Sequence, residues 1–212
     1  IGCRDGKDVI VEAADGYRYA SRMVGKYESN KTVPKALIPL RSVSKFAGLP
    51  GEGYVLGISN AYVGVKNGSC IAYSRTNSGD FPDVRSNLPT KFDVVVRLDR
   101  DEFTRTMSVA QVYADESYRS SEVEISPTGM KIKANTGGSG EYVGRIKAIK
   151  GKGKKVEFLL DSKGLADFAA MSKGHVTMAC KEGLNPIVMK DDSDKDFVYV
   201  VWPLVKRKEG QL

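Results

Sequence analysis

Short stretches in which apolar and polar residues alternate, separated by turn residues, run through most of this sequence. The first stretch, Asp8 to Ala14, is rich in Val and Ile, and its alternation predicts a β-strand. Asp15-Gly16 supplies a tight turn, so Tyr17 to Val24 is expected to return as the second strand of a hairpin. Over Arg41 to Gly48 the spacing becomes helical, with apolar residues on one side and basic or hydroxyl residues on the other.

Further strands are expected on both sides of residue 90. Before it they lie at Lys35 to Pro39, Tyr54 to Ser59, Ala61 to Lys66 and Cys70 to Arg75, with a hairpin turn at Asn67-Gly68. After it they lie at Phe92 to Leu98, Ser121 to Ile125, Lys131 to Ala134, Glu141 to Ile149, Val156 to Leu160, His175 to Cys180, Leu184 to Lys190 and Phe197 to Leu204. Gly151 to Lys155 is expected to be a basic turn, and Lys206 to Leu212 a charged tail.

Two aspartates predict where the helices of the second part begin. Asp99, followed by Glu102, has the pattern of a capping box. The helix after it is expected to bury Phe103, Met107 and Ala110. Asp161 is expected to cap the other helix, which would bury Leu165, Phe168 and Ala169.

The stretch from Phe81 to Pro89 divides the chain into two parts that share one order of elements. Its prolines exclude a central strand or a helix interior. On each side a strand leads into a short helix, a strand, a tight turn and another strand, which indicates an internal duplication. We therefore expect two domains, 1–89 and 90–212, the first without a counterpart of the strand and helix over Phe92 to Tyr113. The groove beside the connector is the candidate binding site.

Composition is that of an ordinary globular protein, with 41% hydrophobic and 28% charged residues. The net charge of +7 suits loose contact with a polyanion such as DNA. No apolar run approaches the roughly 20 residues of a membrane-spanning helix, so no membrane partner is expected. Cys3, Cys70 and Cys180 lack metal-ligand spacing and are expected to be reduced, as in a cytoplasmic protein. Because the chain opens on Ile1, we expect it to be a piece of a longer protein.

Signals of catalytic, metal or cofactor chemistry are weak. His175 is the one histidine, which leaves no His-based triad. Asp191 to Asp196 invites a calcium interpretation, but it lacks the central glycine and distal glutamate of an EF-hand, which favours a solvated hairpin loop. We expect no enzyme activity, no cofactor and no metal. A metal-dependent, β-rich enzyme that uses Asp191 to Asp196 is the rival interpretation.

Four stretches are distinctive: Ala13-Ala-Asp-Gly-Tyr-Arg-Tyr-Ala20, Ile38-Pro-Leu-Arg41, Phe81-Pro-Asp-Val-Arg85 and Phe197-Val-Tyr-Val-Val-Trp-Pro-Leu204. In their order and spacing they resemble the bacterial β sliding clamp family, the ring-shaped processivity subunit of the replicative DNA polymerase. The resemblance implies an α+β clamp fold of two similar domains, each with antiparallel sheets outside and two helices inside. Tyr17, Trp202 and Gly164 depart from the family, which commonly has His, Met and an aromatic residue there, so pocket depth and peptide preference stay open.

The resemblance also implies a non-catalytic clamp that encircles duplex DNA without reading its sequence. Its partners would be the replicative polymerase subunit, the clamp loader and repair proteins, all bound through short linear peptides in the cytoplasm, at the nucleoid. The full-length protein is expected to form a head-to-tail homodimer, and this chain alone a monomer. The expected DNA-facing residues are Arg41, Lys45, Arg85, Arg105 and Lys163. The alternative is a clamp-fold interaction module that does not encircle DNA.

A peptide-binding groove between the two domains is the second site that the resemblance implies. An apolar groove with a few polar groups at its rim is a common way to capture an extended peptide. The expected residues are Ala14, Gly16, Tyr17, Arg18 and Tyr19 of the hairpin, Pro82 and Asn87 of the connector, and Asp161, Leu184, Pro186, Val200, Val201, Trp202, Pro203 and Leu204 of the second domain. Plain core packing is the alternative for Leu184 and Val200.

Overall fold

The computed structural model describes residues 2–4, 8–26, 35–50, 54–59, 61–114, 120–136 and 140–205. The chain divides into two compact units, which are described separately. Unit 1 comprises Ile1–Glu12 and Arg22–Asp83, and unit 2 comprises Ala13–Ser21 and Val84–Leu212. The tip of the first hairpin therefore belongs to unit 2. The charged tail expected at residues 206–212 lies outside the described residues.

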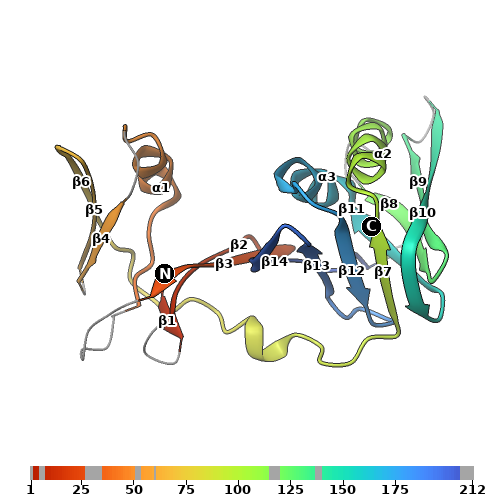
Figure 1. Ribbon diagram of the computed structural model, residues 1–212, viewed down its shortest axis with the longest axis horizontal. Coiled ribbons are helices and arrows are strands. Elements are labelled where there is room, and N and C mark those ends of the chain that lie inside the picture. Colours follow the sequence, from red (N-terminus) through yellow and green to blue (C-terminus); the bar gives the residue numbers. More distant parts are fainter. Residues whose placement is uncertain are drawn as a thin grey trace, which may run out of the picture. The chain divides into compact units, whose positions relative to one another are not determined.

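Unit 1 is built around a three-stranded antiparallel sheet of order β4-β5-β6, with α1 on one side of it (Figure 1). Its elements are β1 (Gly2–Arg4), part of β2 (Asp8–Ala14), part of β3 (Arg18–Lys26), α1 (Leu40–Ala47), β4 (Val55–Ile58), β5 (Tyr62–Asn67) and β6 (Cys70–Arg75). The hairpin turns contain glycines at positive φ, Gly16 (88°) and Gly68 (56°), as their sequence predicts.

The prediction of a strand at Lys35 to Pro39 is wrong. The structure has only an isolated antiparallel bridge there, in which Leu37 pairs with Asn77. Pro39 has no amide proton to donate to a neighbouring strand, and it stands instead directly before α1. The helix is joined to the sheet by a 2.7 Å hydrogen bond between the hydroxyls of Ser42 and Ser74. Although α1 has the expected apolar side, none of its residues is buried, and Val43 is 43% exposed.

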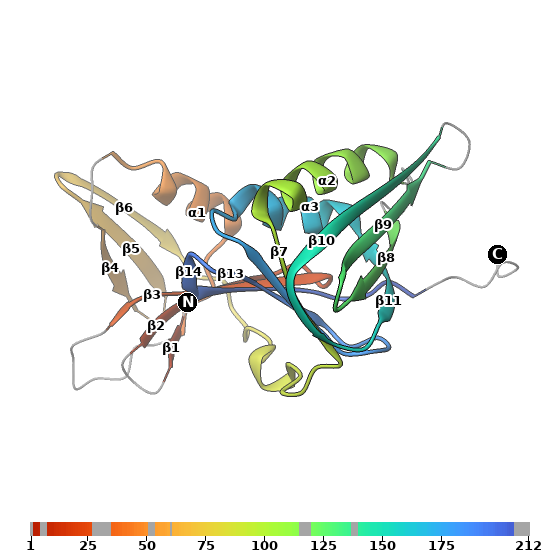
Figure 2. The same cartoon turned by 45° about the vertical axis from the view of Figure 1, so that its right-hand side comes forward.

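Unit 2 contains a continuous run of hydrogen-bonded strands in the order β14-β13-β12-β7-β10-β9-β8-β11, and β3 is the neighbour of β14 (Figure 2). Its strands are β7 (Val94–Leu98), β8 (Ser120–Ser126), β9 (Gly129–Asn135), β10 (Glu141–Gly153), β11 (Val156–Asp161), β12 (Val176–Cys180), β13 (Ile187–Asp191) and β14 (Asp194–Val201). Its helices are α2 (Arg100–Tyr113), α3 (Ser162–Met171) and the short 3-10 helix η1 (Arg85–Asn87).

The helix predictions in unit 2 are confirmed at both caps and in the core. The Asp99 carboxylate accepts hydrogen bonds from the amides of Asp101 and Glu102, and the Asp161 carboxylate accepts one from Lys163. Helices α2 and α3 lie side by side, and the rings of Phe103 and Phe168 meet edge to face at 6.4 Å. The six apolar residues expected inside are all buried: Phe103, Met107, Ala110, Leu165, Phe168 and Ala169.

The basic turn expected at Gly151 to Lys155 is wrong for its first three residues, which continue β10 to Gly153. The first half of β10 pairs with β9, whereas residues 148–153 pair with β7. Glycine makes the crossing possible because the backbones approach closely: a Cβ at Gly153, where φ is +109°, would lie 2.0 Å from the Asp93 carbonyl oxygen. Only Lys154 and Lys155 lie between the end of β10 and the start of β11.

Asp191 is a buried structural carboxylate rather than part of a fully solvated loop. It accepts hydrogen bonds from the amides of Lys173 (2.7 Å) and Gly174 (2.9 Å), and from the Ser193 amide (2.8 Å) and hydroxyl (2.7 Å). Burial raises the pKa of Asp191, but these hydrogen bonds outweigh burial and hold it below its ordinary value. The side chain thus ties the β13–β14 hairpin to the segment that precedes β12.

Burial also determines the chemistry of Cys180, whose thiol has its pKa raised to about 12 by desolvation. The thiol therefore stays protonated and inert at neutral pH. No helix in the described part of the chain is both long and apolar enough to cross a membrane.

We predict that Asp191→Ala lowers the free energy of unfolding of unit 2 by about 2 kcal/mol or more, because the amides of Lys173, Gly174 and Ser193 lose their shared acceptor. Urea unfolding followed through Trp202 fluorescence would measure the change. Asp196→Ala is the matched control, since Asp196 lies on the same hairpin but is exposed. Equal losses in the two variants would contradict the structural role of Asp191.

Candidate functional site

The C-terminal segment, residues 202–205, runs between two parts of unit 2 that are far apart in sequence. The Trp202 amide donates to the Tyr17 carbonyl at 2.9 Å, and the Leu204 amide donates to the Leu159 carbonyl at 2.7 Å. One short stretch of extended backbone therefore joins the hairpin tip to the edge of β11. Backbone hydrogen bonds of this kind hold a segment in place whatever its side chains are.

An ionic cluster holds the hairpin tip against α3. The Arg18 guanidinium donates to Asp15 at 2.7 Å and also to Asp167, which pairs with Lys163 at 2.7 Å. These bonds, with that to Asp15 foremost, raise the pKa of Arg18. Burial raises the pKa of Asp167, but the hydrogen bonds from Lys163 and Arg18 outweigh it, so the pKa lies below its ordinary value. Asp15, Arg18 and Asp167 are thus held in their charged forms.

Tyr19 anchors the other side of the hairpin tip. Its side chain is 1% exposed, and its hydroxyl accepts a hydrogen bond of 3.2 Å from Arg85 Nε. Arg85 Nη2 donates to the Ser21 hydroxyl at 2.7 Å. The guanidinium of Arg85 therefore fastens η1 to the start of β3.

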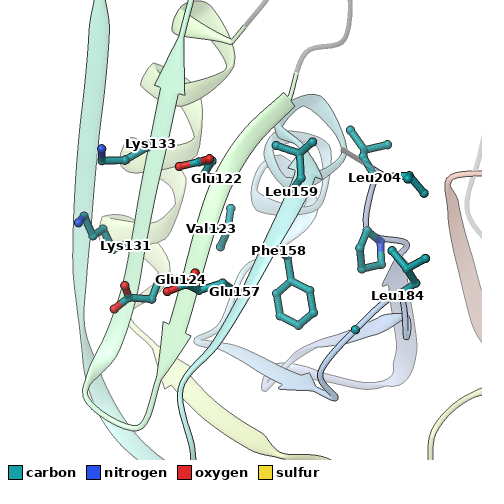
Figure 3. Close-up of a pocket in the computed structure, with 13 residues that line it drawn as sticks. Glu122, Val123, Glu124, Lys131, Lys133, Glu157, Phe158, Leu159, Leu184 and Leu204 are labelled. Atoms are coloured by element: carbon teal, nitrogen blue, oxygen red, sulfur yellow. The ribbon is translucent and has the colours of Figure 1, made fainter. Parts of the chain in front are cut away.

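A groove of about 580 Å³ opens beside the C-terminal segment (Figure 3). Its lining residues are Glu122, Val123, Glu124, Lys131, Lys133, Glu157, Phe158, Leu159, Gly183, Leu184, Pro203, Leu204 and Val205. Figure 3 shows that the leucines gather at the side of the C-terminal segment and the charged side chains over β8 and β9. The groove is therefore apolar at one end and ionic at the other.

The ionic end follows from the strand register. Glu122 lies opposite Lys133, and Glu124 lies opposite Lys131, so each row of β8 and β9 carries one charge of each sign. Lys155 adds pairs to Glu124 (3.4 Å) and to Glu157 on β11 (2.9 Å). These exposed pairs leave the surface polar and nearly balanced, which suits the rim of a binding groove better than a catalytic centre.

The residues expected to bind a peptide fall into three groups. Leu184, Pro203 and Leu204 line the groove, and Leu184 is 62% exposed. Four side chains are buried and do not line it: Tyr19, Pro186, Val200 and Val201. The remainder lie around the hairpin tip, the connector and the start of α3: Ala14, Gly16, Tyr17, Arg18, Pro82, Asn87, Asp161 and Trp202. Of the whole set, Pro82 alone belongs to unit 1.

The ionic lining of the groove was not expected from the sequence. Glu122, Lys131, Lys133 and Glu157 occupy the solvent-facing positions of alternating strands, a pattern that surface strands share whether or not they bind anything. Phe158 and Leu159 were expected only as part of a strand, without a surface role. What turns these positions into a groove is the C-terminal segment alongside β11, which no local pattern reveals.

The residues expected to face DNA differ in how far their charges are already engaged. Arg41 and Lys45 are exposed on α1, one helical turn apart, and Arg105 is exposed on α2. Lys163 pairs with Asp167, and Arg85 donates to Tyr19 and Ser21. The first three side chains therefore extend into solvent, whereas the last two also hold the fold together.

Nothing in the described ranges supports a metal centre, since no group of three or more His, Cys, Asp or Glu side chains is placed to hold an ion there. In the loop from Asp191 to Asp196, the first carboxylate is occupied by amide donors, and Asp192 pairs with Arg97 at 2.5 Å. The rival enzyme interpretation finds no observation to support it in these residues.

We predict that acid loosens the hairpin tip from α3. The pKa values of Asp15 and Asp167 are lowered on folding, so their contribution to stability is present above the unfolded value, about 4, and is lost as the pH falls through the folded values. Unfolding of unit 2, followed by Trp202 fluorescence between about pH 6 and pH 2, would measure the loss. Asp167→Asn should flatten this dependence and Asp196→Asn should not; an unchanged acid limb in Asp167→Asn would contradict the assignment.

Comparisons with known proteins agree with this architecture. A family model described as DNA polymerase III beta subunit, C-terminal domain, matches residues 85–205, which is more than half of the chain. The beta sliding clamp of Pseudomonas aeruginosa is 23% identical over 202 residues, covering 91% of this chain and 53% of that protein. The beta sliding clamp of Chlamydia muridarum is 22% identical over 166 residues, covering 76% of this chain and 45% of that protein. The chain thus spans about half the length of these curated relatives.

Solved structures confirm the expected fold class. The DNA polymerase III subunit beta of Pseudomonas aeruginosa superposes with a TM-score of 0.86 at 21% identity, covering 95% of this chain and 56% of that one. The DNA polymerase sliding clamp of Bacillus subtilis gives a TM-score of 0.85 at 18% identity, with the same coverage of 95% and 56%. At these identities the superpositions show the fold, while the family model shows the relationship. The chain belongs to the bacterial β sliding clamp family, as part of a beta subunit of DNA polymerase III.

Proposed function

We propose that this chain is the peptide-binding part of a non-catalytic processivity clamp, which encircles duplex DNA and tethers the polymerase and other replication or repair proteins. The observation that carries the proposal is the groove beside residues 202–205, apolar at one end and ionic at the other. We take the two repeats to be the domains 1–89 and 90–212, and the protein to work in the cytoplasm, at the nucleoid.

The groove suits a short extended peptide. Leu159, Leu184 and Leu204 offer an apolar surface for one or two large side chains, which is where the affinity of such complexes concentrates. The C-terminal segment and β11 are already joined by backbone hydrogen bonds, so the groove needs little rearrangement before a ligand enters. The charged end then orders the flanking residues of the peptide and contributes selectivity more than affinity.

Sliding on duplex DNA requires diffuse positive charge without base readout. Arg41, Lys45 and Arg105 supply solvent-facing cations on helices, where they can approach phosphates without entering a groove. Lys163 and Arg85 stay in this set as weaker candidates, because their charges also serve the fold.

The first half of β10 is a candidate surface for assembly into a ring. Residues 141–147 pair with β9, and their other edge has no strand partner among the described residues. Near this edge Tyr113 stacks on Tyr142 at 6.0 Å, while Val112 and Val143 are 71% and 37% exposed. A second subunit that extends the sheet would satisfy the edge and cover these side chains, as in a head-to-tail homodimer of the full-length protein. This chain alone would be a monomer.

We predict that the double variants Leu184→Ala/Leu204→Ala and Trp202→Ala/Pro203→Ala each weaken binding of a fluorescein-labelled clamp-binding peptide by about tenfold or more. Fluorescence anisotropy would give the dissociation constants. Val112→Ala is the control, because Val112 is apolar and 71% exposed but lies on α2. A lack of saturable binding by the unmodified chain, or equal loss in the control, would refute the peptide site.

We also predict that the chain binds linear duplex DNA weakly and with a steep salt dependence. Each of the variants Arg41→Ala, Lys45→Ala and Arg105→Ala removes one cation that contacts a phosphate. Each should therefore reduce the slope of log K against log salt concentration by about 1. Lys190→Ala, an exposed lysine on β13, is the control and should leave the slope unchanged. Nanomolar binding that resists salt would be incompatible with a sliding contact.

A further inference from the structure

The sheet of unit 1 exposes an ordered array of side chains on the face opposite α1. Directly opposed residues on neighbouring antiparallel strands point to the same side, so the register defines the array. Its rows are Val55, Lys66 and Ile71; Gly57, Gly64 and Tyr73; and Tyr62 with Arg75. We call these eight residues the β4–β6 face.

The β4–β6 face is unusually exposed for its apolar content. Tyr73 is 77% exposed, Val55 and Ile71 are each 67% exposed, and Tyr62 is 45% exposed. The alternate residues of β5, Val63 and Val65, are buried on the other side of the sheet. Large apolar and aromatic side chains gathered on one open face indicate a contact surface rather than scattered surface residues.

The two glycines keep the middle row flat, although the sheet itself does not need them. A Cβ on Gly57 would approach nothing closer than 3.9 Å, and one on Gly64 nothing closer than 3.7 Å, both ordinary contacts. Neither glycine has a positive φ. Glycine inside a strand costs conformational entropy and leaves no side chain to pack, and it often marks a place where a ligand approaches the backbone. The flat row lies directly beside the Tyr73 side chain.

The charge of the β4–β6 face has a single sign. From Tyr54 to Asn77 the sequence contains no Asp or Glu, and its charged residues are Lys66 and Arg75. Both are exposed on this face, and the Arg75 guanidinium lies 5.9 Å from the centre of the Tyr62 ring. An anionic partner is therefore favoured, and one with planar groups can use the tyrosine rings and the two glycines in the row of Tyr73.

We propose that the β4–β6 face binds single-stranded nucleic acid. Unstacked bases lie on Tyr62 and Tyr73, and the phosphates lie near Lys66 and Arg75, which is how sequence-tolerant single-strand binders combine aromatic rings with cations. Duplex DNA suits the face poorly, because its bases are stacked inside the helix and present no free faces. The site lies in unit 1 and uses none of the residues assigned to the peptide groove, so the two assignments can be tested independently.

The test is anisotropy of fluorescein-labelled dT20 with the full 212-residue chain at low salt. Tyr73→Ala should weaken binding by about fivefold or more, and Tyr62→Ala/Tyr73→Ala further, as expected when stacking is removed. Gly64→Val should also weaken binding, by filling the flat row, while its thermal unfolding midpoint stays equal to or above that of the unmodified chain. Tyr54→Ala is the matched control: Tyr54 is 52% exposed and directly precedes β4, but it lies outside the array.

Weaker dT20 binding by the Tyr73→Ala and Gly64→Val variants, with unchanged binding by Tyr54→Ala, supports the proposal. Three results overturn it. The first is no binding of dT20 at low salt, and the second is that Tyr54→Ala weakens dT20 binding as much as Tyr73→Ala does. The third is that Lys66→Glu weakens dT20 binding while Tyr73→Ala does not, which would mean that charge attraction alone holds the DNA. When Tyr73→Ala is added to the Arg41→Ala/Lys45→Ala variant, it should still weaken dT20 binding. Peptide binding measured on the same variants should not change, which separates failure here from failure of the proposed function.

Discussion

Two backbone hydrogen bonds of the C-terminal segment hold the candidate site together. Trp202 bonds to Tyr17 and Leu204 to Leu159, so residues 202–205 join the hairpin tip to β11. Without them, Leu184 and Leu204 would be ordinary exposed leucines, and the charged rows of β8 and β9 an ordinary strand surface. Because the donors and acceptors belong to the main chain, these two hydrogen bonds do not depend on which side chains the segment carries, Trp202 included.

Electrostatics reinforces the same arrangement from the opposite side. Arg18 lies between Asp15 and Asp167, and Arg85 lies between Tyr19 and Ser21, so both guanidinium groups fasten the hairpin tip. Arginine suits this role because its planar fork can hold two partners at once. The cations proposed for DNA, Arg41, Lys45 and Arg105, are by contrast left exposed to solvent. The basic residues of this chain thus divide into those that build the site and those available to a polyanion.

In both units a helix is followed by three strands, but the two units differ in burial. In unit 2, α3 buries Leu165 and Phe168 against α2 and the sheet, whereas α1 in unit 1 buries no residue. The sheets differ as well: β12 to β14 are largely buried, while β4 to β6 leave the β4–β6 face open. The two units therefore share a backbone pattern while the surfaces that they expose differ.

Local sequence determined most of the elements, the caps at Asp99 and Asp161, the turns at Gly16 and Gly68, and the buried faces of α2 and α3. These depend on neighbours a few residues apart, so periodicity and turn chemistry suffice. Only the tertiary structure decided that Gly151 to Gly153 extend β10, that Asp191 is buried among amides, and that Glu122, Lys133 and Leu159 line a groove. Each of these depends on segments far apart in the chain whose close approach is encoded by packing as a whole and leaves no local pattern to recognise.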